Sequence, residues 1–151
     1  MEYRLANNND TDRLAELCWE RKAEEKTLDV KKKQDFIQYC SGFIKTLFEE
    51  NYCCWIAAEN GQIISHIYVI TVKKVPTPEN LNSKWAYLTT ARTIPEYRNR
   101  GIGTALMARV KIWCDEQGFG YIRVHPSKRS VAYYERAGFK RNNDVMDLLL
   151  K

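Results

Sequence analysis

Two β-rich runs joined by an Asn-Gly turn constrain the fold of this chain more than any other feature of its sequence. The runs cover residues 53–58 and 63–72, and Asn60-Gly61 between them is the dipeptide that most strongly favours a tight antiparallel hairpin. The second run is apolar at consecutive positions, so both of its faces should be covered by other elements. The sequence therefore predicts a hairpin whose second strand lies near the middle of a sheet.

Periodic helix and strand patterns continue on both sides of the hairpin. We expect strands at 2–5, 53–58, 63–72, 85–93, 121–124, 139–141 and 145–150, and helices at about 11–26, 29–48, 102–117 and 129–137. The segment 74–83, which contains two prolines, is expected to be a loop. Hairpins and helical crossovers alternate in this order, so the sequence predicts one α/β domain over residues 1–151, a sandwich around a mixed sheet.

The composition excludes several classes of protein. Hydrophobic residues make up 44% of the chain and aromatic residues 12%, which is enough apolar material for a packed core and excludes a disordered chain. No apolar run approaches the roughly 20 residues needed to span a bilayer, and the first residues lack the basic-then-apolar order of a signal peptide. We therefore expect a soluble, cytoplasmic protein with no membrane partner.

The cysteines and histidines do not form a metal-binding pattern. The cysteine count is odd, no two cysteines have CxxC spacing and the two histidines lie far apart in the sequence. We therefore expect no metal, and we expect the cysteines to be buried, reduced thiols. The residues concerned are Cys18, Cys40, Cys53, Cys54, Cys114, His66 and His125.

Positive charge is concentrated in one part of the chain. Residues 92–141 hold eleven Lys and Arg but four Asp and Glu, a net charge of +7, whereas the whole chain carries +5. Such a basic segment indicates an anionic partner. A nucleic acid and a phosphorylated cofactor both meet this condition, and charge alone does not separate them.

A glycine-containing segment lies between a predicted strand and a predicted helix, and it reads Arg98-Asn99-Arg100-Gly101-Ile102-Gly103-Thr104. The start of a helix presents unpaired N–H groups and the positive end of its dipole to an anion. The two glycines let the backbone turn these amides toward the anion, and the two arginines add positive charge. The ending of a P-loop is absent and Leu106 replaces the third glycine of a dinucleotide-binding fingerprint, so both of those motifs are excluded.

These residues resemble the pyrophosphate loop of the GCN5-related N-acetyltransferases, because Pro95-Glu96-Tyr97 comes just before Arg98-x-x-Gly101-x-Gly103. A second stretch, from Ser130 to Phe139, is similar to that family's second conserved helix, which ends in Tyr-Glu-x-x-Gly-Phe. The expected strand order agrees along nearly the whole chain, although the amino-terminal third matches in its helix–helix layout alone. The resemblance implies an α/β/α sandwich with a mixed, largely antiparallel sheet that is splayed between its fourth and fifth strands.

The resemblance also implies which residues hold acetyl-CoA. The backbone at Arg92 and Thr93 would pair with the pantetheine arm in the splay. Arg98 and the amides of the loop would hold the pyrophosphate, and these amides belong to Asn99, Arg100, Gly101, Ile102, Gly103 and Thr104. Ser127 stands where the family often has Asn, and it would touch the cofactor or cap the following helix.

By the same resemblance, Tyr134 would be the acid that protonates the leaving thiolate. A phenol with a pKa of about 10 suits a CoA sulfur of comparable basicity. Its neighbour Tyr133 competes for the direction that faces the site. His66, on an apolar strand, is expected to be a core histidine with its hydrogen bonds satisfied. His125 follows a strand near the cleft, where a place beside the cofactor, a structural role and an acid–base role all stay open.

The predicted reaction is direct transfer of acetyl from acetyl-CoA to a primary amine in a ternary complex, with a strand N–H stabilising the oxyanion. No cysteine lies in a nucleophile motif, which argues against a covalent intermediate. The fourth predicted strand lacks the glutamate that many family members use as general base. A water chain, His66, or an acceptor that arrives partly neutral would replace it, and the sequence does not choose among them.

The acceptor and the partners are less constrained. The acceptor would be a small-molecule or peptide amine, contacted by the two amino-terminal helices, the 74–83 loop and the final strands, and Arg92 would favour an acidic acceptor if its side chain entered the cleft. A homodimer stays open.

The alternative is a non-catalytic module that senses CoA or binds nucleic acid. A nucleic-acid role is disfavoured because Tyr121, Tyr133 and Tyr134 are assigned to a strand or a helix.

Overall fold

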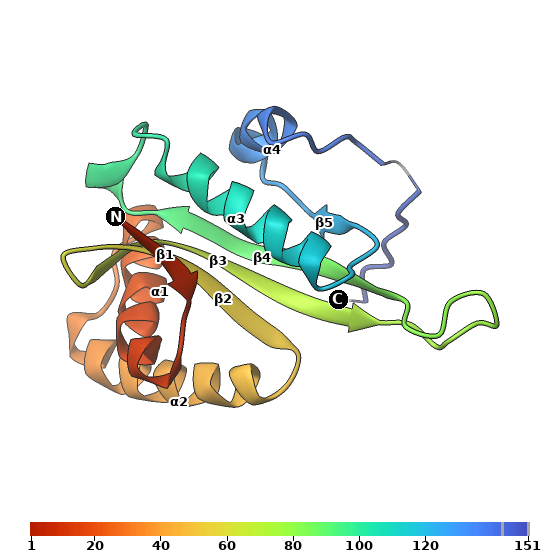
Figure 1. Cartoon of the computed structure of the whole chain (residues 1–151). Helices are drawn as coiled ribbons and strands as arrows, with labels where there is room; N and C mark the ends of the chain where they lie inside the picture. Colours follow the sequence, from red (N-terminus) through yellow and green to blue (C-terminus); the bar gives the residue numbers. More distant parts are fainter. Residues whose placement is uncertain (143, 151) are drawn as a thin grey trace.

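A five-stranded mixed sheet forms the middle layer of the protein (Figure 1). The structure is a computed structural model that describes residues 1–142 and 144–150. The strands lie in sequence order, and they are β1 (Glu2–Leu5), β2 (Tyr52–Glu59), β3 (Gln62–Lys73), β4 (Lys84–Thr93) and β5 (Ile122–Val124). The first four pair antiparallel and β5 pairs parallel with β4. This arrangement confirms the predicted mixed, largely antiparallel sheet.

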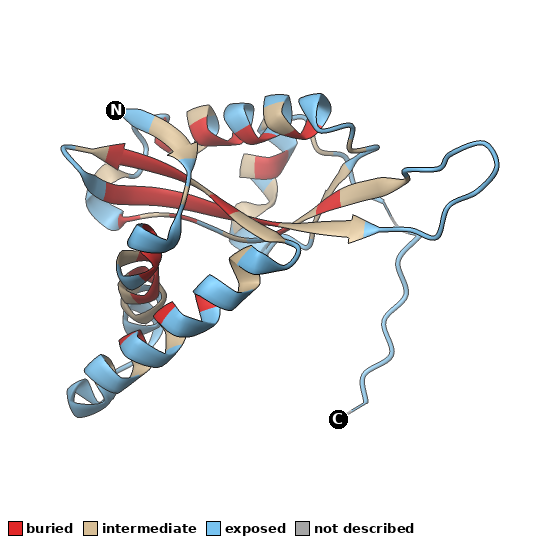
Figure 2. Cartoon of the chain, turned by 60° about the horizontal axis from the view of Figure 1, so that its bottom comes forward, coloured by how far each residue is buried: buried red, intermediate tan, exposed pale blue. Residues whose placement is uncertain are grey.

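Helices cover both faces of this sheet (Figures 1 and 2). On one face lie α1 (Thr11–Glu25) and α2 (Lys33–Glu49), and on the other lie α3 (Ile102–Glu116) and the short α4 (Val131–Arg136). Short 3-10 turns precede each of them, at Asn8–Asp10, Val30–Lys32, Pro95–Tyr97 and Lys128–Ser130. Each face has its own apolar cluster, one under α1 and α2 and one under α3 and α4. Within the described residues, no helix is both long enough and apolar enough to cross a membrane.

The Asn-Gly turn forms the predicted hairpin between β2 and β3. Asn60 and Gly61 have φ angles of 51° and 79°, the left-handed pair that a two-residue hairpin turn needs. Every residue of β3 from Ile63 to Val69 is buried. The prediction of a central strand is therefore confirmed, and the strand owes this place to apolar side chains on both of its faces.

A bulge in β4 changes which face its side chains occupy. Val69 of β3 pairs with Leu88, but Ile67, two residues away, pairs with Ala91, so β4 contains one extra residue. Val69, Ile67 and Leu88 all pack in the cluster under α3 and α4. The extra residue brings Arg92 to the opposite face, toward α1, where it pairs with His66 across the strands.

The sheet opens between β4 and β5. Their ladder contains three pairs, from Ala86↔Ile122 to Leu88↔Val124, whereas β4 continues for five more residues to Thr93. Thr89 and Ala91 in this stretch are exposed, because within the described residues β5 pairs with β4 no further than Leu88. This is the splay predicted between the fourth and fifth strands.

The final pair of strands is a wrong prediction. Residues 139–141 and 145–150 have neither helix nor strand structure, and the apolar side chains of Met146, Leu148, Leu149 and Leu150 are exposed. Between these segments stand polar residues such as Asn142 and Asp144, which are depleted in strands, and the leucines are consecutive rather than alternating with polar residues. The segment thus lacks the period-two pattern that pins a strand to one face of a sheet.

Candidate active site

The start of α3 faces the opened edge of β4 and has the features of an anion site. Gly101 is its N-cap residue, with φ 75°, and no side-chain hydrogen bond caps the helix in the part of the chain that the structure describes. The first turn therefore leaves backbone N–H groups available, at the positive end of the helix dipole. A Cβ placed on Gly103 would lie 3.4 Å from Thr93 Oγ1 on the neighbouring strand. Gly103 thus keeps the surface beside Thr93 open, and Gly101 provides the positive φ at which the chain enters α3.

The two arginines of this segment do not point toward the start of α3. Arg98 Nε donates to the carbonyl oxygen of Thr93 at 3.0 Å, and its Nη2 donates to Glu24 on α1 at 2.8 Å. The guanidinium carbon of Arg100 lies 5.0 Å from the ring centroid of Tyr97. Backbone amides, rather than these guanidinium groups, are therefore the donors already in place at the glycine turn.

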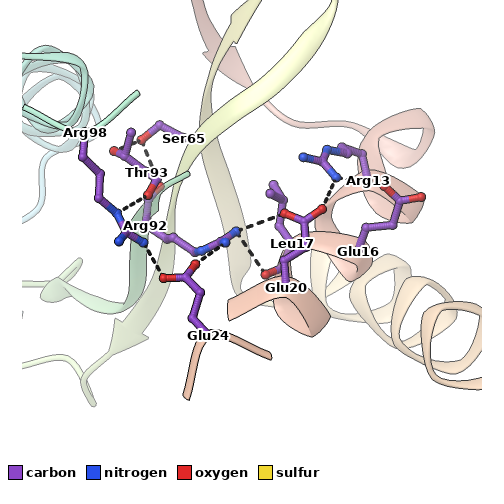
Figure 3. A network of polar contacts seen from close by, with 9 residues as sticks. All are labelled: Arg13, Glu16, Leu17, Glu20, Glu24, Ser65, Arg92, Thr93 and Arg98. Atoms are coloured by element: carbon purple, nitrogen blue, oxygen red, sulfur yellow. Dashed lines mark hydrogen bonds and ion pairs between the residues drawn. The ribbon is translucent and has the colours of Figure 1, made fainter. Parts of the chain in front are cut away.

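Arg98 belongs to a polar network that joins α1 to β4 (Figure 3). Arg92 Nη2 donates to Glu24 at 2.6 Å, and Arg92 Nη1 contacts the carbonyl oxygen of Leu17 at 3.3 Å and Glu20 at 3.6 Å. The side chain of Arg92 is 5% exposed and that of Glu24 is 32% exposed. Burial would raise the pKa of the Glu24 carboxyl, but hydrogen bonds from both arginines hold it below its ordinary value.

This network answers the question of what the Arg92 side chain does. It turns away from the opened edge and is neutralised by α1, so the condition under which it would favour an acidic acceptor is not met. The carbonyl oxygens of the two β4 residues expected beside the cofactor are also engaged. That of Arg92 accepts from Ser65 Oγ at 3.0 Å, and that of Thr93 accepts from Arg98. Sequence reasoning missed Glu20 and Glu24, and no motif marks them.

The two adjacent tyrosines of α4 have different surroundings. The Tyr133 hydroxyl donates to the carbonyl oxygen of Gly103 at 2.8 Å, which ties α4 to the first turn of α3. Tyr134 is 7% exposed and packs against Phe139 in the cluster under α3 and α4. Burial raises the pKa of both phenols, to about 12 for Tyr133. Both hydroxyls therefore keep their protons at neutral pH.

A cavity of about 1080 Å³ lies between β5, α4 and residues 139–142, 145 and 147, and both Tyr134 and His125 line it. His125 Nδ1 is 2.8 Å from the hydroxyl of Tyr87 on β4, and the two rings meet edge to face at 5.5 Å. Ser127 is exposed at the start of the 3-10 turn before α4, with its hydroxyl 3.0 Å from that of Ser130. The Tyr87–His125 pair was not anticipated, because it joins residues from two strands.

His66 departs from the prediction of a satisfied core histidine. It is buried, as predicted, but neither ring nitrogen has a hydrogen-bond partner among the described residues. Burial, and then the positive charge of Arg92, lowers the pKa of His66 to about 3.

All five cysteines are free thiols. Among the described residues, no group of three or more His, Cys, Asp or Glu is arranged to hold a metal ion.

Comparison with known proteins gives a family match and many similar folds. The family model described as "Acetyltransferase (GNAT) family" matches residues 10–139. A predicted acetyltransferase from Clostridium acetobutylicum, solved with acetyl-CoA, is 25% identical, with a TM-score of 0.76 over 99% of this chain and 96% of that one. No curated protein matches the sequence.

Two further solved structures share the fold at lower identity. A GCN5-related N-acetyltransferase from Ralstonia eutropha is 22% identical, with a TM-score of 0.71 over 99% of both chains. An aminoglycoside acetyltransferase from an uncultured soil metagenomic sample, solved with trehalose, is 15% identical, with a TM-score of 0.75 over 99% of this chain and 95% of that one. These likenesses show a common architecture.

Proposed function

The chain belongs to the GNAT acetyltransferase family, and on that premise we propose that it transfers an acetyl group from acetyl-CoA to a primary amine. The amine would attack the thioester carbonyl directly, in a ternary complex. The acceptor would be a small molecule or a peptide. A similar acetyltransferase, 25% identical over nearly the whole chain, was solved with acetyl-CoA, which supports the choice of donor.

The observation that carries the proposal is the uncapped glycine turn of α3 beside the opened edge of β4. The N–H groups from Gly101 to Thr104 suit a pyrophosphate, since no side chain caps the helix and Gly103 leaves room next to Thr93. The stretch from Thr89 to Ala91, whose first and last residues are exposed, offers a strand edge on which an extended arm can lie. Acetyl-CoA supplies the activated acetyl thioester, and the chain supplies the donors that would orient it.

The surroundings of Tyr134 support its role as the acid. Its hydroxyl is protonated at neutral pH, as an ordinary phenol is, burial raises the pKa of Tyr134 further, and its side chain lines the cavity beside β5. A backbone N–H of the opened β4 edge would stabilise the oxyanion. Burial also raises the pKa values of the thiols, to about 11 for Cys40 and Cys114 and about 12 for Cys53. Such thiols are protonated at neutral pH, which supports direct attack over a cysteine intermediate.

A matched pair of glycine substitutions tests the donor site. Gly101 and Gly118 lie at opposite ends of α3 with φ angles of 75° and 73°, and a Cβ at either one meets open space. Gly101→Glu places a carboxylate where the pyrophosphate would bind, whereas Gly118→Glu introduces similar backbone strain and the same charge away from it. Calorimetry should show acetyl-CoA binding weakened at least about tenfold by the first change, because like charges repel there, and nearly unchanged by the second. Equal affinities would rule out this site.

Turnover is then measured with acetyl-CoA and a panel of amines that includes spermidine, an aminoglycoside and a lysine-containing peptide. Tyr134→Phe should lower kcat by about 100-fold, as loss of a general acid does, while acetyl-CoA affinity stays within about twofold because the phenol is no phosphate ligand. An unchanged kcat would reject Tyr134 as the acid. Tight acetyl-CoA binding without acetylation of any amine would favour the non-catalytic sensor.

A further inference from the structure

We propose that the imidazole of His125 is the general base that deprotonates the acceptor amine, and that Tyr87 holds it in the working tautomer. The inference rests on the proposed acetyl transfer and supplies the base that β4, which carries no acidic residue, does not. It stands on the contact between the two side chains and on their place in the sheet.

Tyr87 and His125 lie where β4 and β5 separate. The ladder between β4 and β5 ends at Leu88↔Val124, and Tyr87 and His125 flank that last pair. They therefore lie at the vertex of the splay. A pantetheine arm that ran from the glycine turn of α3 along the open edge of β4 would bring its thioester to this vertex. His125 is exposed and Tyr87 is partly buried, so an acceptor can reach the imidazole from solvent.

The proposed base, His125, and the proposed acid, Tyr134, approach the splay from different faces of the sheet. Leu88 and Val124 pack in the cluster under α3 and α4, together with Tyr134. Tyr87, next to Leu88 in β4, projects from the other face because side chains alternate along a strand. His125 follows β5, and its ring lies against Tyr87 on that face. Both His125 and Tyr134 nevertheless line the cavity at β5. A base and an acid that approach one vertex from two faces suit a reaction in which the nucleophile arrives on one side of a carbonyl and the leaving group departs from it.

The contact with Tyr87 favours one tautomer of the His125 imidazole. The Tyr87 oxygen is 2.8 Å from Nδ1 of His125. When Nδ1–H donates to that oxygen, Nε2 keeps a free lone pair and can accept a proton from the acceptor. Tyr87 is thus a positioning residue, and His125 is the group that touches the acceptor.

The proton balance closes with these two residues. The acceptor ammonium gives one proton to Nε2, and its freed lone pair forms the N–C bond to the thioester carbon. The C–S bond breaks, and the thiolate takes the proton of the Tyr134 hydroxyl. The nitrogen loses its second proton as the amide forms, and that proton restores the Tyr134 hydroxyl. The proton held on Nε2 of His125 then passes to solvent, to which the side chain is exposed.

The other candidate bases fit less well. His66 is fully buried under α1, with its pKa lowered to about 3 by burial and then by Arg92, so it is cut off from an acceptor and is a poor base. Glu24 is held by two arginines, whose hydrogen bonds keep its pKa below its ordinary value against the effect of burial.

A pH-resolved comparison of variants tests the base. With the best amine of the panel above, His125→Gln should lower kcat/KM about 100-fold at pH 7, and the deficit should shrink to within about threefold at pH 9.5, where the amine is itself increasingly neutral and needs no base. Charged groups that share the surface and cavity with His125 are Arg123, Lys128, Glu135, Lys140, Arg141 and Asp147, so ionic strength is held constant. The matched control Lys140→Gln removes a charge from the same cavity and should show no pH-dependent recovery.

Imidazole nitrogen spectra test the tautomer without any acceptor. The chain has two histidines, so His125 is assigned by the signal that His125→Gln removes. Its neutral form should carry the proton on Nδ1, and Tyr87→Phe should shift the population toward Nε2–H. The control Tyr121→Phe removes another hydroxyl from the same region and should leave the tautomer unchanged.

The outcomes separate this inference from the function on which it rests. A wild-type chain that acetylates no amine overturns both. Turnover with a deficit in His125→Gln that is equal at pH 7 and pH 9.5, or with no deficit at pH 7, overturns the inference and leaves the acetyl transfer standing. A proton on Nε2 in the wild-type protein also overturns it.

Discussion

His66 is a polar side chain placed in an apolar interior without a partner. It lies on β3 under α1, and its ring meets that of Tyr68 edge to face at 5.4 Å. Because neither ring nitrogen has a partner among the described residues, the imidazole is costly to bury and costlier still to protonate. A buried group of this kind makes the stability of the fold depend on pH.

We therefore predict a loss of stability in mild acid that His66 causes. Its pKa is about 3 in the folded chain, against about 6.5 when unfolded, so the unfolded state binds more protons between these values. The free energy of unfolding that the protein has with His66 neutral is fully present above pH 6.5, and it is lost progressively as the pH falls toward 3. Between pH 7 and pH 4.5 the wild-type free energy of unfolding should drop by about 2–3 kcal/mol more than that of His66→Phe.

Urea unfolding at the two pH values measures this difference. The comparison between variants removes the common effect of the carboxylates, since both chains contain the same ones. Parallel losses in the two chains would show that His66 is not the group that titrates.

Single residues were the hardest scale to predict from the sequence. The resemblance places the backbone of Arg92 beside the cofactor, but it says nothing of the side chain, whose partner Glu24 is 68 positions away with no local pattern to pair them. The partner state of His66 depends on what α1 brings above it, which strand periodicity does not encode. The sequence does not distinguish Tyr133 from Tyr134, and the structure gives them different surroundings: the Tyr133 hydroxyl donates to Gly103, and the Tyr134 side chain lines the cavity.

At the scale of elements, a Gly→Ala substitution should have opposite effects in the hairpin turn, where φ is positive, and in the helix α2. Gly61→Ala should destabilise the protein by about 1 kcal/mol, because φ is 79° there and a Cβ disfavours that conformation. Gly42→Ala should stabilise it by about 0.5–1 kcal/mol, because Gly42 lies in α2 with nothing within 4 Å of the added Cβ. Thermal unfolding of the two variants measures both signs, and two shifts in the same direction would contradict the prediction.

Elements with strong local signals were predictable, and those without them were not. The hairpin follows from Asn60-Gly61, and α3 follows from an apolar stripe between two glycines that take positive φ angles at its ends. The bulge in β4 has no such signal, since Thr89 and Thr90 suit a regular strand equally well. Residues 145–150 do not form a strand, because their apolar residues lack the alternation with polar residues that binds a strand to one face of a sheet.

On the scale of the whole molecule, charge is distributed unevenly, with +7 in residues 92–141 against +5 for the chain. This field should attract the phosphates of the donor, and salt should screen it. We expect kcat/KM for acetyl-CoA to fall about tenfold between 50 and 500 mM NaCl. The value for acetyl-pantetheine, which has the thioester arm without the nucleotide, should stay within about twofold. Equal salt dependence for the two donors would show that the charge serves another partner.

Because β4 contains one extra residue, the number of residues in that strand decides which face its later side chains occupy. A substitution at Thr89 or Thr90 alters one side chain, whereas deletion of one of them would turn every later residue of the strand over. Arg92 would lose Glu24, and Thr93 would leave its place beside Gly103. Between Leu88 and Ala91, the gene can therefore accept mutations that substitute a residue far more readily than the loss of a codon.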